Sequence, residues 1–230
     1  MKKRLAIAFI VSFGVLLAIV LLVPLIASGA DRNPTQALMK SLAEGTASPQ
    51  SVKAQLAAGA DPKWTQAFSR QTLLMLAADG WKFNPDTLDD SSKEADAARD
   101  RWNAVSPEIC TLLIEAGCDV NARGRDGITP LAMSTTLDCQ PEVTKVLLAN
   151  GADPNPEGVK ADKMPLFLSV LSGCPKTAEL LIKAGARIPD QTPDGTKSFL
   201  KFAEDNTKFA GTPALDAIKA AKAPAASSAK

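Results

Sequence analysis

A glycine that recurs at a fixed spacing constrains the fold of this 230-residue chain more than any other feature. Gly117, Gly151 and Gly185 lie 34 residues apart, and each comes shortly after a Leu-Leu pair. Gly59 ends a related segment 58 residues before Gly117, a distance of one period plus an insertion of about 24 residues. Periods of roughly 20 to 50 residues are typical of repeat proteins, whose units bury their apolar faces against one another. The sequence therefore predicts a stacked array of similar units.

Signals for two helices flank each glycine. A Thr-Pro-Leu motif or a variant of it begins 11 to 13 residues after each glycine, at Thr72, Thr129 and Met164, and a weaker match begins at Thr196. Threonine can cap a helix and proline fits its first turn, so each motif is expected to open a helix. The segment before each glycine also begins with a proline, at Pro49, Pro107, Pro141 and Pro175. Because glycine readily ends a helix in the left-handed conformation, one unit is predicted to be helix, turn, helix and extended finger.

These segments resemble the ankyrin-repeat family, closely over residues 105–188 and more weakly over residues 34–80 and 189–222. The resemblance implies an all-α ankyrin-repeat solenoid of about five helix-turn-helix-finger units, occupying residues 31–222. It also implies a function, because proteins of this family bind other proteins through the finger tips and the first helix of each unit.

The chain departs from the family at one repeated position. A His usually follows the Thr-Pro-Leu motif, and Met75, Ala132 and Phe167 stand there instead. The family's His makes a hydrogen bond between neighbouring fingers. We therefore expect the fingers of this chain to be less rigid.

Both ends of the array are predicted to be atypical helix pairs. Residues 34–44 and 49–58 predict an N-terminal pair, and residues 196–206 and 213–223 predict a C-terminal pair. Terminal units of a solenoid need a polar outer face, which the charged side chains of the C-terminal pair supply. Residues 223–230 are small and low in complexity, which predicts a flexible tail.

Residues 1–30 have the pattern of a signal peptide or a membrane anchor. Residues 2–4 are Lys-Lys-Arg, and residues 5–23 carry no charge. Small residues near Ala30 suit cleavage, whereas the length of the apolar run suits retention, and both fates stay open. Either fate is expected to place residues 31–230 on the periplasmic side of a bacterial inner membrane, anchored or released, because the basic flank stays inside. Membrane contact is then expected only through residues 5–23.

Residues 81–104 form the insertion in the first full repeat. They include Trp81, Phe83, Trp102 and a run of acidic residues. Two interpretations stay open: a lobe or lid that binds a partner, or a solvated loop held on the repeats by its aromatic side chains. Residues 91–101 are good helix formers, so they are expected to be helical or to lengthen the next helix.

Composition argues against several kinds of chemistry. The chain has no His, which is the commonest general base and the commonest metal ligand. It also has no Cys-x-x-Cys motif and no glycine-rich phosphate loop. The net charge is +1, which gives no electrostatic reason to expect nucleic acid as a ligand. We therefore expect neither an enzyme nor a site for a metal or cofactor.

The four cysteines divide into two pairs. Cys139 and Cys174 fall in the turns before the second helices of consecutive units, so this pair is the candidate disulfide. Such a bridge needs Cα atoms within about 7 Å, whereas neighbouring helices pack roughly 8–10 Å apart, so two free thiols remain the alternative. Cys110 and Cys118 would lie about 12 Å apart at the two ends of one helix and are expected to be buried thiols.

The fingers carry the candidate binding residues. Trp64 and Phe68 lie in residues 61–71, Arg123 and Arg125 in residues 121–128, and Lys160 and Lys163 in residues 155–163; residues 189–195 are the fourth finger. Tryptophan and arginine are enriched among residues that dominate binding energy. The alternatives are that the two aromatic residues pack on the insertion or on the N-terminal helices, and that the cations pair with the acidic insertion or are merely solvated.

Together these features predict a monomeric, non-catalytic module that binds a protein of unknown identity outside the cytoplasm. The alternative function is that of a dedicated inhibitor or immunity-type protein that blocks one enzyme or toxin. An inhibitor is expected to bind one target tightly in a one-to-one complex, whereas a scaffold is expected to bind several proteins more weakly.

Overall fold

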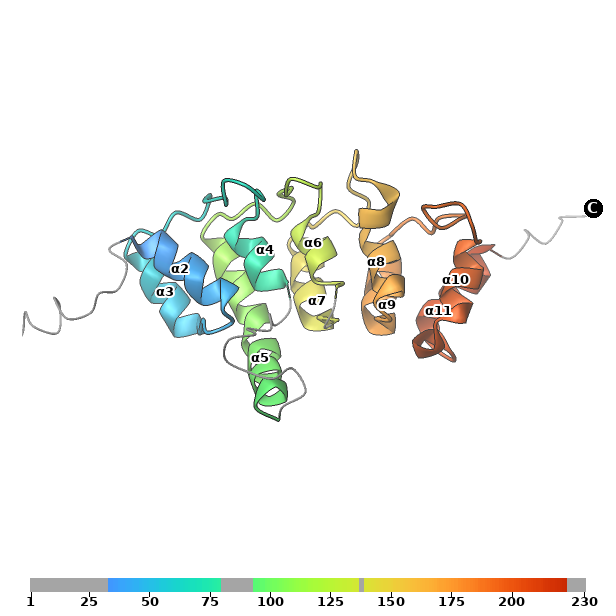
Figure 1. Ribbon diagram of the computed structural model, residues 1–230, viewed down its shortest axis with the longest axis horizontal. Helices are drawn as coiled ribbons and strands as arrows, with labels where there is room; N and C mark the ends of the chain where they lie inside the picture. Colours follow the sequence, from blue (N-terminus) through green and yellow to red (C-terminus); the bar gives the residue numbers. More distant parts are fainter. Residues whose placement is uncertain (1–32, 80–92, 137–138, 223–230) are drawn as a thin grey trace, which may run out of the picture.

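The computed structural model describes residues 33–79, 93–136 and 139–222, which form a row of helix pairs (Figure 1). The first helices of the pairs are α2 (Pro34–Ala43), α4 (Leu73–Ala78), α6 (Pro130–Met133), α8 (Pro165–Leu171) and α10 (Phe199–Asp205). The second helices are α3 (Pro49–Ala57), α5 (Lys93–Glu115), α7 (Pro141–Ala149), α9 (Pro175–Lys183) and α11 (Pro213–Lys222). Two short 3₁₀ helices are η1 (Ala161–Lys163) and η2 (Thr207–Phe209). The fingers run along one edge of the row, and α5 extends beyond the opposite edge.

The pairs stack in chain order. The second helices α3, α5, α7, α9 and α11 contact one another in sequence, and so do the first helices α2, α4, α6 and α8. Extended pairing in the described part of the chain is limited to two isolated bridges, at Thr65–Thr72 and Gln191–Ser198. The expected all-α repeat fold is therefore confirmed for the described residues.

Side-chain caps fix where most first helices begin. The hydroxyl oxygens of Thr72 and Thr129 each accept the backbone N–H three residues on, at 3.2 Å. The expected start at Thr196 is wrong, because α10 begins at Phe199. Ser198 caps that helix, whereas the Thr196 hydroxyl donates to the Asp194 carboxylate at 2.8 Å. Thr196 is therefore part of the fourth finger and does not start a helix.

The glycine spacing reflects a required backbone conformation. Gly117, Gly151 and Gly185 have φ values of 100°, 85° and 87°, in the left-handed region that other residues adopt only with strain. After each glycine the next N–H bonds back to a buried leucine carbonyl of the helix; Cys118, for example, donates to Leu113 at 3.0 Å. This bond turns the chain out of the helix and into the finger.

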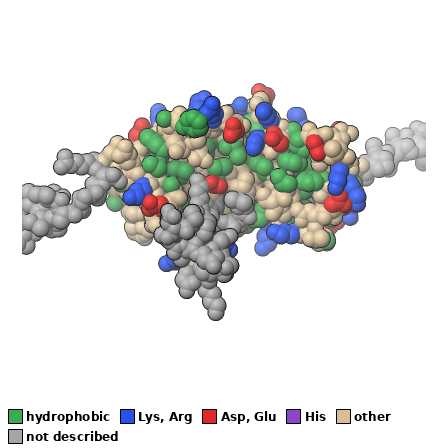
Figure 2. Space-filling model, in the orientation of Figure 1, with side chains coloured by type: hydrophobic (Ala, Val, Ile, Leu, Met, Phe, Trp, Pro, Cys, Tyr) green, Lys and Arg blue, Asp and Glu red, His purple; other side chains and the backbone are tan. Residues whose placement is uncertain are grey.

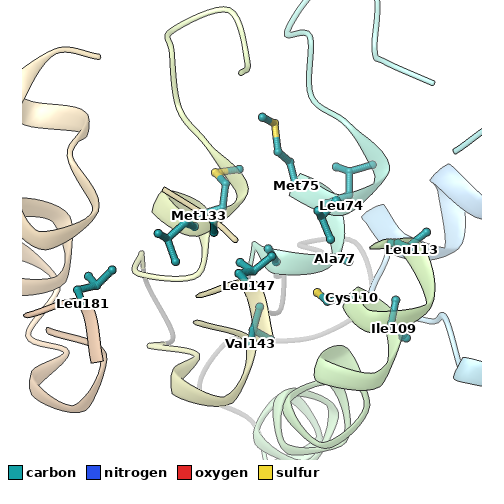
Figure 3. Packing of buried hydrophobic residues seen from close by; sticks show 14 of the residues in the cluster. Leu74, Met75, Ala77, Ile109, Cys110, Leu113, Met133, Val143, Leu147 and Leu181 are labelled. Carbon is teal, nitrogen blue, oxygen red and sulfur yellow. The ribbon is translucent and has the colours of Figure 1, made fainter. Parts of the chain in front are cut away.

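Equivalent leucines of successive units form the core. Leu113, Leu147 and Leu181 are each 0% exposed and lie at the same position of α5, α7 and α9. Figure 3 shows them with Val143 and Ile109 between the helix pairs. Burying a leucine side chain contributes about 1.5–3 kcal/mol, so this repeated contact is a main source of stability.

Helix α5 departs from the expected repeat. Pro107 was expected to open the second helix of its unit, but it lies inside a helix that begins at Lys93. An interior proline removes one backbone hydrogen bond. The burial of Trp102, which is 2% exposed, and the 2.9 Å hydrogen bond from Ser106 Oγ to Gln140 Oε1 offset that loss. Residues 93–101 lengthen the next helix, as one sequence interpretation expected, whereas residues 80–92 lie outside the described part.

Two asparagines connect neighbouring fingers. Asn121 Nδ2 donates to Gly151 O at 3.0 Å, and its Oδ1 accepts the Asp153 N–H at 2.8 Å. Asn155 repeats the arrangement one unit later, with Gly185 O at 2.9 Å and the Arg187 N–H at 2.7 Å. These bonds join the fingers at a different position from the His that the chain lacks.

A disulfide also joins two units. Cys139 and Cys174, in the turns before α7 and α9, are bridged with their Cα atoms 5.3 Å apart. The turns approach more closely than helix axes do, and Cys139 has a left-handed φ of 49° at this point. The bridge therefore links the α6–α7 unit to the α8–α9 unit.

The predicted segments at the two ends of the chain, residues 1–30 and 223–230, lie outside the described residues. Within residues 33–79, 93–136 and 139–222, no helix combines the length and hydropathy needed to cross a bilayer.

Candidate protein-binding face

The clearest exposed aromatic side chain lies on the first finger. Phe68 is 79% exposed, and the guanidinium carbon of Arg125 lies 4.7 Å from the centre of its ring. The backbone supports this pair, because the Arg125 N–H donates to Ser69 O at 2.8 Å. A cation over an aromatic ring contributes about 0.5–1 kcal/mol at an exposed site. The first two fingers thus present one ordered apolar and cationic surface.

Trp64 lies elsewhere. Its side chain is half-buried against the core, and it lines a hollow of about 360 Å³ with Met39 and Lys40 of α2 and with Glu44, the residue after that helix. This placement matches the alternative in which Trp64 packs on the N-terminal helices. Trp64 and Phe68 therefore do not form one aromatic patch.

The remaining predicted cations gather at the third finger. Lys160 is exposed just before η1, and Lys163 is its last residue. Arg123 reaches across from the second finger, since a Cβ placed on Gly158 would lie 3.7 Å from Arg123 Nη1. Lys160 and Lys163 thus lie on the third finger, and Arg123 reaches it from the second.

These cations differ from those on the second helices. Lys145 pairs with Glu142 at 2.8 Å, and Lys183 pairs with Glu179 at 2.6 Å. In the described part of the chain, no ion pair involves Arg123, Arg125, Lys160, Lys163 or Arg187. Among the described residues, the charges of these five side chains are therefore not neutralised by ion pairs.

Sequence reasoning missed an apolar groove between the third and fourth fingers. Its volume is about 250 Å³. The groove is lined by Pro154, Val159, Ala161, Met164, Leu166, Phe167, Arg187, Pro189, Gln191 and Pro193. Figure 2 shows hydrophobic side chains gathered on this face of the molecule, including the part over α8.

A second hollow, of about 410 Å³, extends the groove towards α10. It shares Phe167 with the groove and adds Phe202 and the 56% exposed Leu171. The rings of Phe167 and Phe202 stack with centroids 5.4 Å apart. One signal in the sequence could have indicated this surface: Phe167 and Leu171 are four residues apart and share a helix face, and Phe167 stands where the family has a polar His.

The two free cysteines lie away from this face. Cys110 and Cys118 are both buried. Burial raises the pKa of the Cys110 thiol far above its usual range and that of Cys118 to about 12. Cys118 Sγ donates to Pro62 O at 3.1 Å. Both thiols act as small apolar groups of the stack.

Among the described residues, no group of three His, Cys, Asp or Glu side chains is arranged to hold a metal ion. A comparison with curated proteins found no match for the chain. A family model of ankyrin repeats matches residues 96–192 in three copies, which span α5 to the fourth finger. Both this match and the helix-turn-helix-finger geometry identify residues 96–192 as three ankyrin repeats, a kind of unit that generally binds other proteins.

Proposed function

We propose that this chain is a non-catalytic module that holds a partner protein against its fingers and first helices. The observation that carries the proposal is the exposed Phe68–Arg125 pair. A phenylalanine that is 79% exposed contributes little to folding, but it would contribute about 1.5–3 kcal/mol if a partner buried it. Arg125 is already ordered on the ring, so binding costs less side-chain entropy.

The proposed contact surface comprises the predicted residues and the groove. Phe68 and Arg125 form its N-terminal part, and Arg123, Lys160 and Lys163 form its middle. Trp64 is included in this surface because its half-buried side chain lines the hollow beside α2. Ankyrin repeats engage partners along this face, which supports the extension over several units.

The proposed location is the periplasmic side of a bacterial inner membrane, with the chain either anchored or released. The basic residues 2–4 and the uncharged residues 5–23 support export. The Cys139–Cys174 bridge suits an oxidising compartment. Alkaline phosphatase fused after Lys230 tests this location, because the enzyme becomes active only after export. An inactive but stably expressed fusion would refute it.

Site-specific photocrosslinking in living cells tests the binding function. A benzoylphenylalanine at position 68 is expected to capture a partner. The same group at Lys145, on the outer side of α7, serves as the matched control and is expected to capture none. Equal capture at the two positions, or capture only at position 145, would contradict the proposal.

The captured complex also separates the two candidate functions. A one-to-one complex with nanomolar affinity for a single enzyme or toxin would favour the inhibitor or immunity-type protein. Weaker capture of several proteins would favour a scaffold. In both cases Phe68→Ala and Arg125→Glu are expected to weaken binding at least tenfold without changing the circular dichroism spectrum, whereas Lys145→Glu should leave binding unchanged.

A further inference from the structure

We infer that the groove between the third and fourth fingers recognises a bulky apolar side chain adjacent to a carboxylate, in an extended segment of the partner protein. The inference rests on the proposed binding function and specifies the chemistry of the partner. It concerns a part of the face that does not include Phe68.

The size and lining of the groove suit a protein side chain. Apolar walls come from both fingers and from α8, with Val159, Met164, Phe167 and Pro189 among them. The groove of about 250 Å³ continues into the neighbouring hollow of about 410 Å³, and this elongated surface suits an extended segment. One or two apolar side chains fit such a space.

Arg187 is the one charged residue among those that line the groove. The equivalent residue in the three preceding units is aspartate: Asp61, Asp119 and Asp153. Each of these carboxylates accepts the backbone N–H two residues on, at 2.8–2.9 Å, and so stabilises its own turn. A guanidinium has no acceptor and cannot make that bond. The fourth unit therefore places a cation at the groove where the other units have a turn-stabilising carboxylate.

The surrounding charges favour an anionic group on the partner. Arg187 is exposed and forms no ion pair in the described part of the chain, and Arg123 lies near Gly158 of the third finger. The acidic side chains nearby are Asp153, Glu157, Asp162, Asp190 and Asp194. Asp190 is paired with Lys222 at 2.7 Å, and Asp153 accepts the Asn155 N–H at 2.8 Å. Asp194 is already held by the Thr192 and Thr196 hydroxyls at 2.6 and 2.8 Å.

A carboxylate fits better than other anions. The planar guanidinium can bind a carboxylate through two parallel hydrogen bonds. The apolar walls do not match a phosphate backbone, which is recognised by rows of cations. An apolar side chain beside an aspartate or glutamate satisfies the walls and Arg187 at once.

Selection of random peptides on the immobilised full chain tests the inference. A phage library of linear 12-residue peptides is expected to yield sequences with Leu, Phe, Trp or Met next to Asp or Glu. Replacing that acid by its amide should weaken binding about tenfold. Arg187→Gln should cause a similar loss, and the two losses should not add. Arg187→Lys should restore part of the affinity, and Lys145→Glu, on the outer side of α7, should leave it unchanged.

Several results would overturn the inference. They are the absence of enriched peptides, an enriched motif without an acid, and binding that does not depend on Arg187. Displacement of the peptides by micromolar decanoate would assign the groove to a fatty-acid-like ligand and would also overturn it. The photocrosslink from position 68 is independent of the groove, so its success or failure tells whether the broader binding function stands.

Discussion

Reduction of the Cys139–Cys174 disulfide should lower the free energy of unfolding by about 2–4 kcal/mol. The bridge joins residues 35 apart, and closing a loop of this size restricts the unfolded chain by about 4 kcal/mol at 25 °C. One effect reduces this figure. Cys139 has a φ of 49°, a conformation that costs about 1–2 kcal/mol, and a reduced turn that relaxes would recover that cost in the folded state.

Urea unfolding followed by circular dichroism measures the effect. Reductant is expected to lower the urea midpoint of the wild-type chain by roughly 1–2 M, given slopes of about 1–3 kcal/mol per molar urea. The double variant Cys139→Ala, Cys174→Ala should unfold near the reduced midpoint and should not respond to reductant. Cys110 and Cys118 are free thiols in both proteins, so they provide the internal control.

Two results would refute the reasoning. If reductant leaves the wild-type midpoint unchanged, the bridge does not restrict the unfolded chain. If reductant also shifts the double variant, the effect arises at another site. Peptide mapping without reductant identifies the bridge directly, because the two peptides that contain Cys139 and Cys174 should be recovered as one linked species.

Three further predictions concern the stack itself. Asn155→Ala removes two hydrogen bonds between fingers and should lower the free energy of unfolding in urea by about 1–3 kcal/mol. Asn150→Ala removes one hydrogen bond, to Val146 O in the preceding turn of helix, and should lower the free energy of unfolding by less. Equal losses for the two variants would contradict the inter-finger role of Asn155. Because burial raises the pKa of the Cys110 and Cys118 thiols, neither should react with Ellman's reagent at pH 8 in the folded chain, and both should react in urea; rapid labelling of the folded chain would contradict their burial. Pro107→Ala restores a backbone N–H donor inside α5 and should raise the free energy of unfolding by about 1–3 kcal/mol, which would be seen as a higher urea midpoint. A lower midpoint would show that the proline is required.

Helix boundaries were largely predictable because local residues determine them. A proline at the first position and a capping hydroxyl mark most starts, and glycine or a small residue marks the ends. The expected N-terminal pair, residues 34–44 and 49–58, differs from α2 and α3 by one residue at each C-terminus. The repeat period could be determined from this sequence alone, because the chain contains several copies of the same unit.

Features that depend on distant residues were not predictable in this way. Pro107 signals a helix start locally, but contacts of Trp102 and Ser106 with the rest of the stack extend the helix through it. The stacking of Arg125 on Phe68 requires the spacing between two fingers. The apolar groove requires two neighbouring fingers and α8 at once, and no contiguous motif encodes it.

Within the chain, positions that form the contacts between units carry the same residue in successive units, whereas some positions on the finger side carry different residues. The buried leucines and left-handed glycines are the same in three successive units, because every interface between units has the same shape. Two positions vary instead. The residue after Thr-Pro-Leu or its equivalent is buried as Met75 and Ala132 but reaches the groove as Phe167, and the turn aspartate of earlier units becomes Arg187.

Both changes occur in the units that form the groove. Phe167 also stacks on Phe202 of α10 and so contributes to the contact between units, whereas the exposed side chain of Arg187 lies on the surface between the third and fourth fingers. Exposed positions that touch few neighbours affect stability by less than about 0.5 kcal/mol. Substitution of Arg187 should therefore alter which segments bind without altering the urea midpoint. Under the proposed function, the repeat array provides a common support, and a few side chains that differ between units determine which partner segments bind.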